Sequence, residues 1–166
     1  ESVNNPIRFL MGWYGIHTME LPPVSFIAAY WMLGAFLMAV KRLAEYRQIG
    51  DKAVAAAYRR SFAYYTQETL FSNIVFFATA FALFAGIFLA KYRLELVFSV
   101  PFFAGALGFY MHLGFLPDSP AQRPEKLYRH KPFMAFVLVT VAVTVWLLII
   151  DIPLIYKFFE TTVPGL

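Results

Sequence analysis

Long apolar stretches alternate with shorter polar ones along the chain. About five stretches approach the 20 residues or so that a helix needs to cross a hydrocarbon layer; they cover residues 6–19, 22–46, 67–90, 94–116 and 132–159. Leu21-Pro22-Pro23 separates the first two, and Lys91-Tyr92-Arg93 separates the third from the fourth. The pattern predicts an all-α fold, a polytopic transmembrane helix bundle that forms a single domain over residues 1–166.

Two polar segments, residues 47–66 and 117–131, connect these spans. The first is rich in alanine from Asp51 to Thr66, which favours a helix lying at the membrane surface. At its end, and entering the third span, is a cluster of aromatic, polar and charged residues typical of the membrane–water interface: Arg59, Arg60, Tyr64, Tyr65, Gln67 and Glu68. The second segment holds three prolines and four basic residues, and indicates a solvated loop near anionic lipid.

Composition supports the membrane interpretation. The chain has 166 residues, of which 60% are hydrophobic and 14% charged, against about 25% charged in a typical soluble domain. The absence of cysteine excludes disulfides, thiolate nucleophiles and cysteine-ligated metal sites. The net charge of +4 favours anionic lipid or phosphate over nucleic acid, because no basic stretch is long enough to follow a duplex. Since the sequence starts at Glu1 without a signal peptide, we interpret it as the C-terminal portion of a longer protein.

The basic residues predict an orientation in the membrane. If five spans alternate in direction, eleven of the fourteen Lys and Arg residues, Arg8 among them, fall on one side. Only Lys91, Arg93 and Lys157 fall on the other side. Because cytoplasmic loops carry the excess of basic residues, the first span is expected to start at the cytoplasmic face.

Lys41, Arg42 and Glu45 form a charged cluster where the second span ends. On a helix, Lys41 and Glu45 lie one turn apart on one face. One interpretation is structural, in which the cations extend to lipid phosphates and Glu45 pairs with Lys41. The other is a phosphate site, because Lys and Arg bind phosphate oxygens and a carboxylate can hold Mg²⁺.

Two further polar positions have a structural and a functional interpretation. Asn4, Asn5 and Arg8 precede or begin a helix whose N-terminal amides favour anions, although the pattern by itself favours simple capping by Asn. Asp151 lies among apolar residues near the end of the last span, where contact with water at the outer interface is expected. The three histidines are too far apart in sequence to indicate a metal motif.

Several of these motifs resemble a known family. Arg8-Phe9-Leu10-Met11-Gly12, the break at Pro22-Pro23 and the run Lys41-Arg42-Leu43-Ala44-Glu45 are similar to the second half of UbiA-superfamily membrane prenyltransferases. The most similar branch is the decaprenyl-phosphate phosphoribosyltransferase-like one, in which a glycine stands where this chain has Val40. The resemblance covers nearly the whole chain and is most specific between Asn4 and Arg47.

The resemblance implies a site that this chain completes only in part. Members of the family have about nine spans, so these would be the fifth to ninth. In their second Asp-rich motif, Lys41 matches the Lys, Arg42 and Glu45 replace the two Asp residues, and Asp51 matches a later Asp. By resemblance, Glu45 and Asp51 would hold Mg²⁺, and Arg42 would clamp a phosphate directly. The first Asp-rich motif, Asn-Asp-x-x-Asp-x-x-x-Asp, does not occur in this sequence.

Two hypotheses of function follow. In the first, the chain is the C-terminal half of a UbiA-like transferase acting on a polyprenyl (di)phosphate; its activity would depend on the missing N-terminal half. Glu45 would be catalytic, and the substrate would be bound by Lys41, Arg42, Arg8 and Asn5. In the second, it is a catalytically silent subunit of a larger membrane complex, for example an electron-transfer or light-harvesting assembly.

The expected location is the bacterial inner (cytoplasmic) membrane, with the segments 47–66 and 117–131 in the cytoplasm. Membrane lipid, a polyprenyl substrate and other membrane protein chains are the expected partners, and nucleic acid is not. A transporter is less favoured, because in this layout none of the spans has an ionisable residue near its midpoint.

Overall fold

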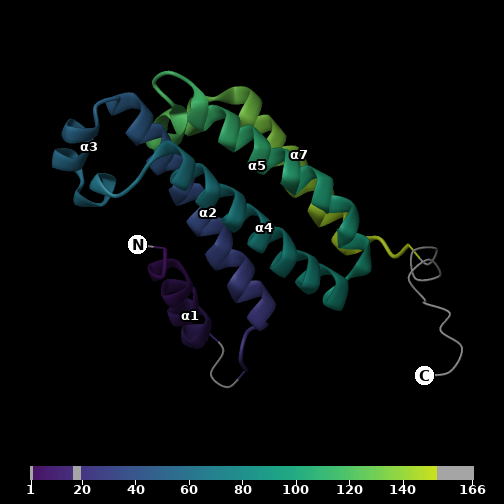
Figure 1. The fold of residues 1–166 in the computed structure, drawn as a ribbon. Coiled ribbons are helices and arrows are strands. Elements are labelled where there is room, and N and C mark those ends of the chain that lie inside the picture. The colour runs from purple at the N-terminus through teal and green to yellow at the C-terminus, as the bar shows by residue number, and fades with distance from the viewer. Residues whose placement is uncertain (1, 17–19, 153–166) are drawn as a thin grey trace, which may run out of the picture.

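The computed structural model describes residues 2–16 and 20–152 and confirms an all-α membrane fold. Four helices are long and apolar enough to cross a membrane. They are α2 (Val24–Ile49), α4 (Gln67–Tyr92), the combination of the 3-10 helix η2 (Leu94–Ser99) with α5 (Val100–Phe115), and α7 (Lys131–Ile149). These helices lie side by side, and α4 packs along much of α2 (Figure 1).

Local sequence signals set the ends of the two longest helices. At the start of α4, Thr66 and Thr69 form a capping box, in which each side chain accepts a hydrogen bond from the other residue's backbone N–H. At the end of α2, Gly50 adopts a φ of 72°, a left-handed conformation that is costly for other residues. α2 therefore continues to Ile49, three residues beyond the limit expected for the second span.

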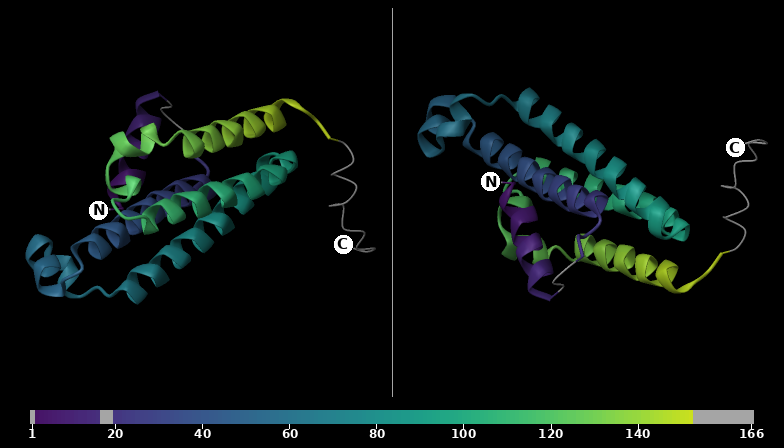
Figure 2. Two further views of the ribbon diagram at one scale, coloured as in Figure 1. Left: turned by 90° about the horizontal axis from the view of Figure 1, so that it is seen from above. Right: turned by 90° about the horizontal axis from the view of Figure 1, so that it is seen from below.

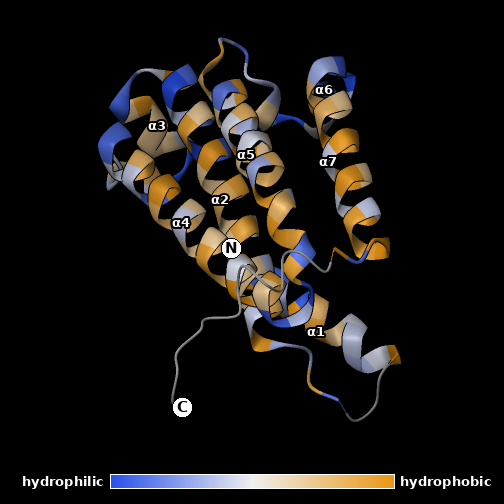
Figure 3. Ribbon diagram, turned by 90° about the vertical axis from the view of Figure 1, so that its right-hand side faces the viewer, coloured by the Kyte–Doolittle hydropathy of each residue, from blue (hydrophilic) through white to orange (hydrophobic). Residues whose placement is uncertain are grey.

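Both polar connections lie at one end of the bundle, which we call the basic end. Residues 47–66 contain α3 (Lys52–Tyr58) and the 3-10 helix η1 (Arg60–Ala63), a shorter helical segment than the one expected from Asp51 to Thr66. Residues 117–131 contain η3 (Pro120–Gln122) and α6 (Pro124–Arg129). Hydrophilic ribbon gathers at this end, whereas α4 and α7 are hydrophobic along most of their lengths (Figure 3).

Small residues let the spanning helices approach closely. A Cβ added at Gly114 of α5 would lie 2.5 Å from Cγ1 of Val40 in α2, and one added at Gly105 would lie 2.8 Å from the Phe136 ring of α7. Val40 is buried in the main hydrophobic core, which α2 shares with α4, α5 and α7. Close approach at glycine therefore holds α5 between α2 and α7, as is common in membrane bundles.

The first helix, α1 (Asn4–Ile16), occupies a different place from the one expected. It has 13 residues, is about 20 Å long, and is not one of the four helices that could span a membrane. It runs beside the first half of α2, and it starts part-way along that helix instead of at the basic end (Figures 1 and 2). The Asn5 side chain lies in the space left by Gly34, which fixes this position. Residues 17–19 of the expected first span lie outside the described residues.

The last spanning helix, α7, ends earlier than the stretch 132–159 predicted. It ends at Ile149, and Ile150 has an extended backbone. The restriction that Pro153 imposes on the residue before it also disfavours helix here. The remainder of that stretch, with Lys157, lies outside the described residues.

The contact between Gly114 and Val40 gives a first prediction. We expect Gly114→Ala to lower the free energy of unfolding in detergent by about 1–3 kcal/mol, because the new methyl group meets a stiff β-branched side chain in a packed core. Gly108→Ala on the same helix is the control, since nothing lies within 4 Å of its added Cβ. Combining Gly114→Ala with Val40→Ala should cost less than the two single changes added together. Additive costs would contradict a direct clash.

Candidate functional site

A cavity of about 510 Å³ opens near the basic end, between α2, α4 and the segment after α3. Residues from four separate parts of the described chain line it: Ser2, Ala35, Met38, Ala39, Arg42, Arg59, Ser61, Tyr65, Leu70, Asn73 and Phe77. We call it the Arg42 pocket. Its volume falls within the usual range for sites that hold small ligands.

The lining of the Arg42 pocket is divided between polar and apolar groups. Arg42 and Arg59 contribute cations, while Ser61, Tyr65 and Asn73 add hydrogen-bonding groups. Ser2 adds another hydroxyl, and the remaining lining residues are apolar and come from α2 and α4. An amphiphilic anion, with a charged head and a hydrocarbon tail, matches both parts of this surface.

A short ion pair orients Arg42. Its Nη1 donates to Oε2 of Glu45 at 2.6 Å, one helical turn further along α2. The two side chains are only 13% and 12% exposed, so solvent screens the pair less than it screens a surface pair. Nη2 of Arg42 also lies 3.8 Å from the sulfur of Met38. These contacts hold the guanidinium at the pocket and show that Glu45 pairs with Arg42.

The other predicted substrate-binding residues are not gathered at this pocket. Lys41 is partly exposed on the neighbouring face of α2 and is not among the described residues that line the cavity. Asn5 packs against Gly34, eight residues before Arg42, or about 12 Å along the helix axis. Arg8 lies further still from Arg42, because α1 runs antiparallel to α2. The structure therefore brings Arg42 and Glu45 together and separates Arg8 from both.

The two carboxylates expected to hold Mg²⁺ have other partners in the fold. Oδ1 of Asp51 accepts hydrogen bonds from the backbone N–H groups of Ala53 at 2.7 Å and Val54 at 3.0 Å, and so caps α3. Glu45 is paired with Arg42. Within residues 2–16 and 20–152, no group of three His, Asp or Glu side chains is arranged to hold a metal ion. The described residues do not fit Mg²⁺ by themselves, and its binding stays a prediction.

Three polar residues of the pocket, Ser2, Ser61 and Asn73, were not predicted from the sequence. Asn73 follows Ser72 near the start of α4, Ser61 lies in η1, and Ser2 lies before the first expected span. Ser2 reaches the pocket because its hydroxyl accepts a hydrogen bond from the Trp31 indole N–H at 3.3 Å. The adjacent polar residues Ser72 and Asn73, inside the apolar stretch that starts at Leu70, were the available signal for Asn73.

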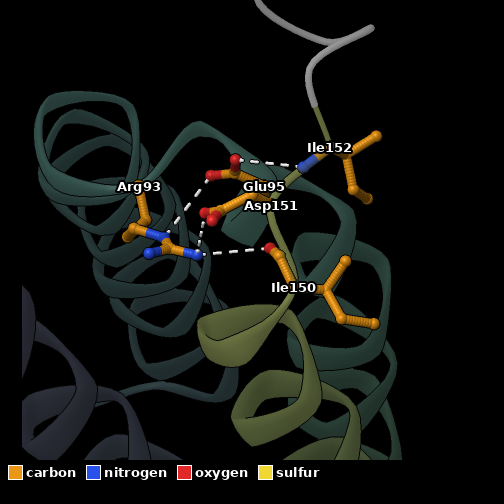
Figure 4. Close-up of polar contacts among 5 residues, drawn as sticks. All are labelled: Arg93, Glu95, Ile150, Asp151 and Ile152. Atoms are coloured by element: carbon orange, nitrogen blue, oxygen red, sulfur yellow. Dashed lines mark hydrogen bonds and ion pairs between the residues drawn. The ribbon is translucent and has the colours of Figure 1, made fainter.

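A second polar cluster lies at the opposite end of the bundle (Figure 4). Arg93 Nη2 donates to Asp151 Oδ1 at 3.0 Å and to the carbonyl of Ile150 at 3.2 Å. Its Nε lies 3.6 Å from Oε2 of Glu95, a fully buried carboxylate whose Oε1 accepts from the Ile152 backbone N–H at 3.5 Å. Arg93 thus ties the end of α4 to the end of α7, and Asp151 has an ionic partner as well as contact with water.

Asp118 and Lys126 form an ion pair within the connection at residues 117–131. The hydrogen bond from Lys126 and the attraction of its charge lower the pKa of the Asp118 carboxyl below 3.8. Asp118 also has a positive φ of 52°, which Asp tolerates better than most residues do. The pair joins the start of this connection to α6, across η3.

The cluster at Arg93 predicts a difference between its two carboxylates. We expect Glu95→Gln to lower the free energy of unfolding by about 1–3 kcal/mol, because it removes the charge from a buried hydrogen-bonded group. Asp151→Asn is the matched control, since this side chain is 80% exposed and its pair is worth at most about 1 kcal/mol. Chemical unfolding in detergent measures both. Equal effects would show that burial at Glu95 has no energetic consequence.

The pair at Asp118 predicts a pH dependence. Because the pKa in the folded chain is depressed, the pair contributes stability above the ordinary Asp pKa and loses it as the pH falls through the lowered value. Titration of the Asp118 carboxyl followed by ¹³C NMR should give a midpoint below 3.8, and Lys126→Gln should move the midpoint up toward the ordinary value. An unchanged midpoint in that variant would contradict the assigned cause.

Comparison with known proteins provides no relative on which a function could be based. No family model, no curated protein and no solved structure matches the chain. The resemblance to the UbiA superfamily therefore stays a prediction from its motifs. What the chain does has to be inferred from its own side chains and their arrangement.

Proposed function

We propose that this chain binds the phosphorylated headgroup of a polyprenyl lipid in the Arg42 pocket, at the cytoplasmic face of the membrane. The observation that carries the proposal is the pairing of two arginines with an apolar wall in one cavity. The ten basic residues of segments 41–60 and 123–131 support the orientation, because cytoplasmic loops carry such an excess.

The two ends of such a lipid correspond to the two parts of the pocket. Guanidinium groups bind phosphate oxygens in a bidentate manner, so Arg42 and Arg59 are suited to the headgroup. Ala35 and Ala39 have small side chains, which leaves room for the first isoprenoid units beside Phe77. The hydrocarbon tail then continues between lipid-facing helix surfaces, where it stays out of water.

Glu45 has a clear task in this proposal. Its carboxylate holds the Arg42 guanidinium by the 2.6 Å hydrogen bond, so that less side-chain entropy is lost when a phosphate binds. This makes Glu45 a positioning residue for binding. A catalytic role for Glu45, a phosphate contact of Lys41 and a contribution of Mg²⁺ belong to the wider proposal of a UbiA-like transferase, which would require carboxylates from outside the described residues.

A role as a non-catalytic subunit is favoured by one specific observation. Both predicted metal ligands, Glu45 and Asp51, are engaged in structural hydrogen bonds. A subunit that only holds a phosphorylated lipid would need the arginines of the pocket and no metal. Binding and transfer are thus separable, and binding is the property to test first.

The test measures binding of a fluorescent geranylgeranyl phosphate to the full chain in neutral-lipid nanodiscs. We expect Arg42→Ala and Arg59→Ala each to weaken binding about tenfold or more, because hydrogen bonds to charged groups are worth about 1.5–3 kcal/mol. Arg60→Ala is the matched control, since Arg60 is adjacent to Arg59 but does not line the pocket. High salt should weaken binding of the lipid phosphate to the unsubstituted chain only modestly, because the pocket excludes part of the solvent.

Three ligands separate the possible sources of binding energy. The phosphate-free geranylgeraniol should bind much more weakly than the phosphate, and inorganic phosphate should compete only at high concentration. If the alcohol binds as tightly as the phosphate, or if Arg60→Ala weakens binding as much as Arg42→Ala, the proposed headgroup site is wrong. Circular dichroism of each variant checks that the helices remain formed.

A further inference from the structure

Arg8 lies at the depth of the apolar part of α2. The Phe9 ring, next to it in α1, contacts the rings of Phe26 and Tyr30 at centroid distances of 5.4 and 5.5 Å. Arg8 is therefore about level with Tyr30, which is six residues after Val24 and eleven before Lys41. With a rise of 1.5 Å per residue, these separations are about 9 Å and about 16 Å along the helix axis.

No described side chain neutralises Arg8. It is exposed, and no hydrogen bond or ion pair joins it to any other residue in the part of the chain that the structure describes. An arginine at this depth is costly in hydrocarbon, by roughly 2.5–3.5 kcal/mol on insertion scales. Such residues usually face a protein partner or a water-filled cavity.

The direction of α1 makes escape to the nearer membrane surface unfavourable. On a helix, the Cα–Cβ bonds tilt toward the N-terminus. The N-terminus of α1 lies near Gly34, deeper along α2 than Tyr30, and its C-terminus lies toward the start of α2. The Arg8 side chain thus starts away from the nearer surface.

The face of α1 that carries Arg8 is open and suited to close helix contact. Asn4, Arg8, Met11 and Gly15 follow each other at helical spacing and are all exposed, and we call them the outer stripe. Nothing lies within 4 Å of a Cβ added at Gly15. Small and polar residues of this kind are enriched where membrane helices pack together. Another face of α1, which carries Asn5 and Phe9, is already packed on α2.

We propose that the outer stripe docks a transmembrane helix of another polypeptide that carries an Asp or Glu near the middle of the membrane, where it pairs with Arg8. Charge complementarity selects this partner over a second copy of the chain. Among the described residues, the carboxylates in or next to the spanning helices lie toward the ends of the bundle: Glu45 and Glu68 at one end, and Glu20, Glu95 and Asp151 at the other. A second copy in the same orientation offers none of them at the depth of Arg8.

The test uses the full chain in phosphatidylcholine vesicles with synthetic transmembrane peptides. Because the chain has no cysteine, a single cysteine at exposed Tyr64 takes a donor dye for energy transfer to labelled peptides. The probe is a Leu–Ala peptide with one central Glu, and its matched controls have a central Gln or the Glu near one end. Each peptide is titrated against the wild-type chain and its variants.

We expect the central-Glu peptide to associate more tightly than either control. Arg8→Leu should weaken its association about 3- to 20-fold, the range that corresponds to polar contacts between membrane helices. Gly15→Leu should weaken it by blocking close approach, whereas Arg60→Leu should leave it unchanged. The Arg8→Glu variant should no longer associate with the central-Glu peptide and should instead associate with a peptide that has a central Lys. This reversal would show that charge pairing, and not a change in folding, causes the association.

Other results would overturn the proposal. Equal association with Arg8→Leu, or equal association of the peptide with a terminal Glu, would show that Arg8 does not pair at mid-depth. Energy transfer between two copies of the chain that depends on Arg8 would assign the stripe to a homodimer instead. In a second measurement, Arg8→Cys labelled by a membrane-impermeant maleimide as fast as Arg60→Cys would show that the position faces water and requires no partner.

Discussion

The low dielectric constant of the hydrocarbon layer governs where charged side chains lie in this bundle. A charge inside the layer has to reach water at a helix end, pair with an opposite charge, or meet a partner. Most basic residues lie in the connections at the basic end, and Arg93 lies at the other end, paired with Asp151 and Glu95. Within the described chain, Arg8 lies away from the helix ends of the bundle and has no opposite charge to pair with, so its surroundings point to a further helix.

The same constraint explains how the Arg42 pocket is built. Arg42 is the second charged residue after the apolar part of α2, so its guanidinium lies at the boundary between hydrocarbon and the polar connections. Glu45 compensates its charge from the next turn and leaves part of the guanidinium directed to the cavity. The segment after α3 then brings Arg59 over the same space. This arrangement produces a cavity with arginines toward the basic end and small apolar residues further along α2.

Much of the fold was predictable, because the signals for spanning helices are local. Apolar length indicates α2, α4, η2 with α5, and α7, and the glycines of α5 indicate close packing. The predicted ends of the spans were less accurate. α2 continues to Ile49, where Gly50 caps it, and α7 ends at Ile149, because the backbone is extended from Ile150. The position of α1 depends on the fit of Asn5 against Gly34, a contact between segments that no local pattern contains.

The candidate site was predictable only in part, for the same reason. Arg42 and Glu45 are neighbours on one helix, so their spacing alone brings them together. Ser2 and Asn73 line the Arg42 pocket because of the way α1, α2 and α4 pack together, and the sequence has no periodic pattern that predicts this packing. Asp51 shows a second limit, because the carboxylate that matches a metal ligand in the motif also caps a short helix, a role that the motif does not indicate.

The Arg42 pocket and the outer stripe are joined through α1. Ser2 lines the pocket just before this helix begins, and Arg8 lies less than two turns further along it. Only one face of α1 is packed on α2, through Asn5, Phe9 and their partners. A helix bound at the outer stripe would cover the other face and reduce the freedom of α1 to move. The Ser2 carbonyl accepts a hydrogen bond from the Asn5 backbone N–H of α1, and the Ser2 hydroxyl accepts one from Trp31 of α2. Occupancy of the stripe would therefore also restrain one edge of the pocket, so that assembly with a partner and preorganisation of the headgroup site depend on the same helix.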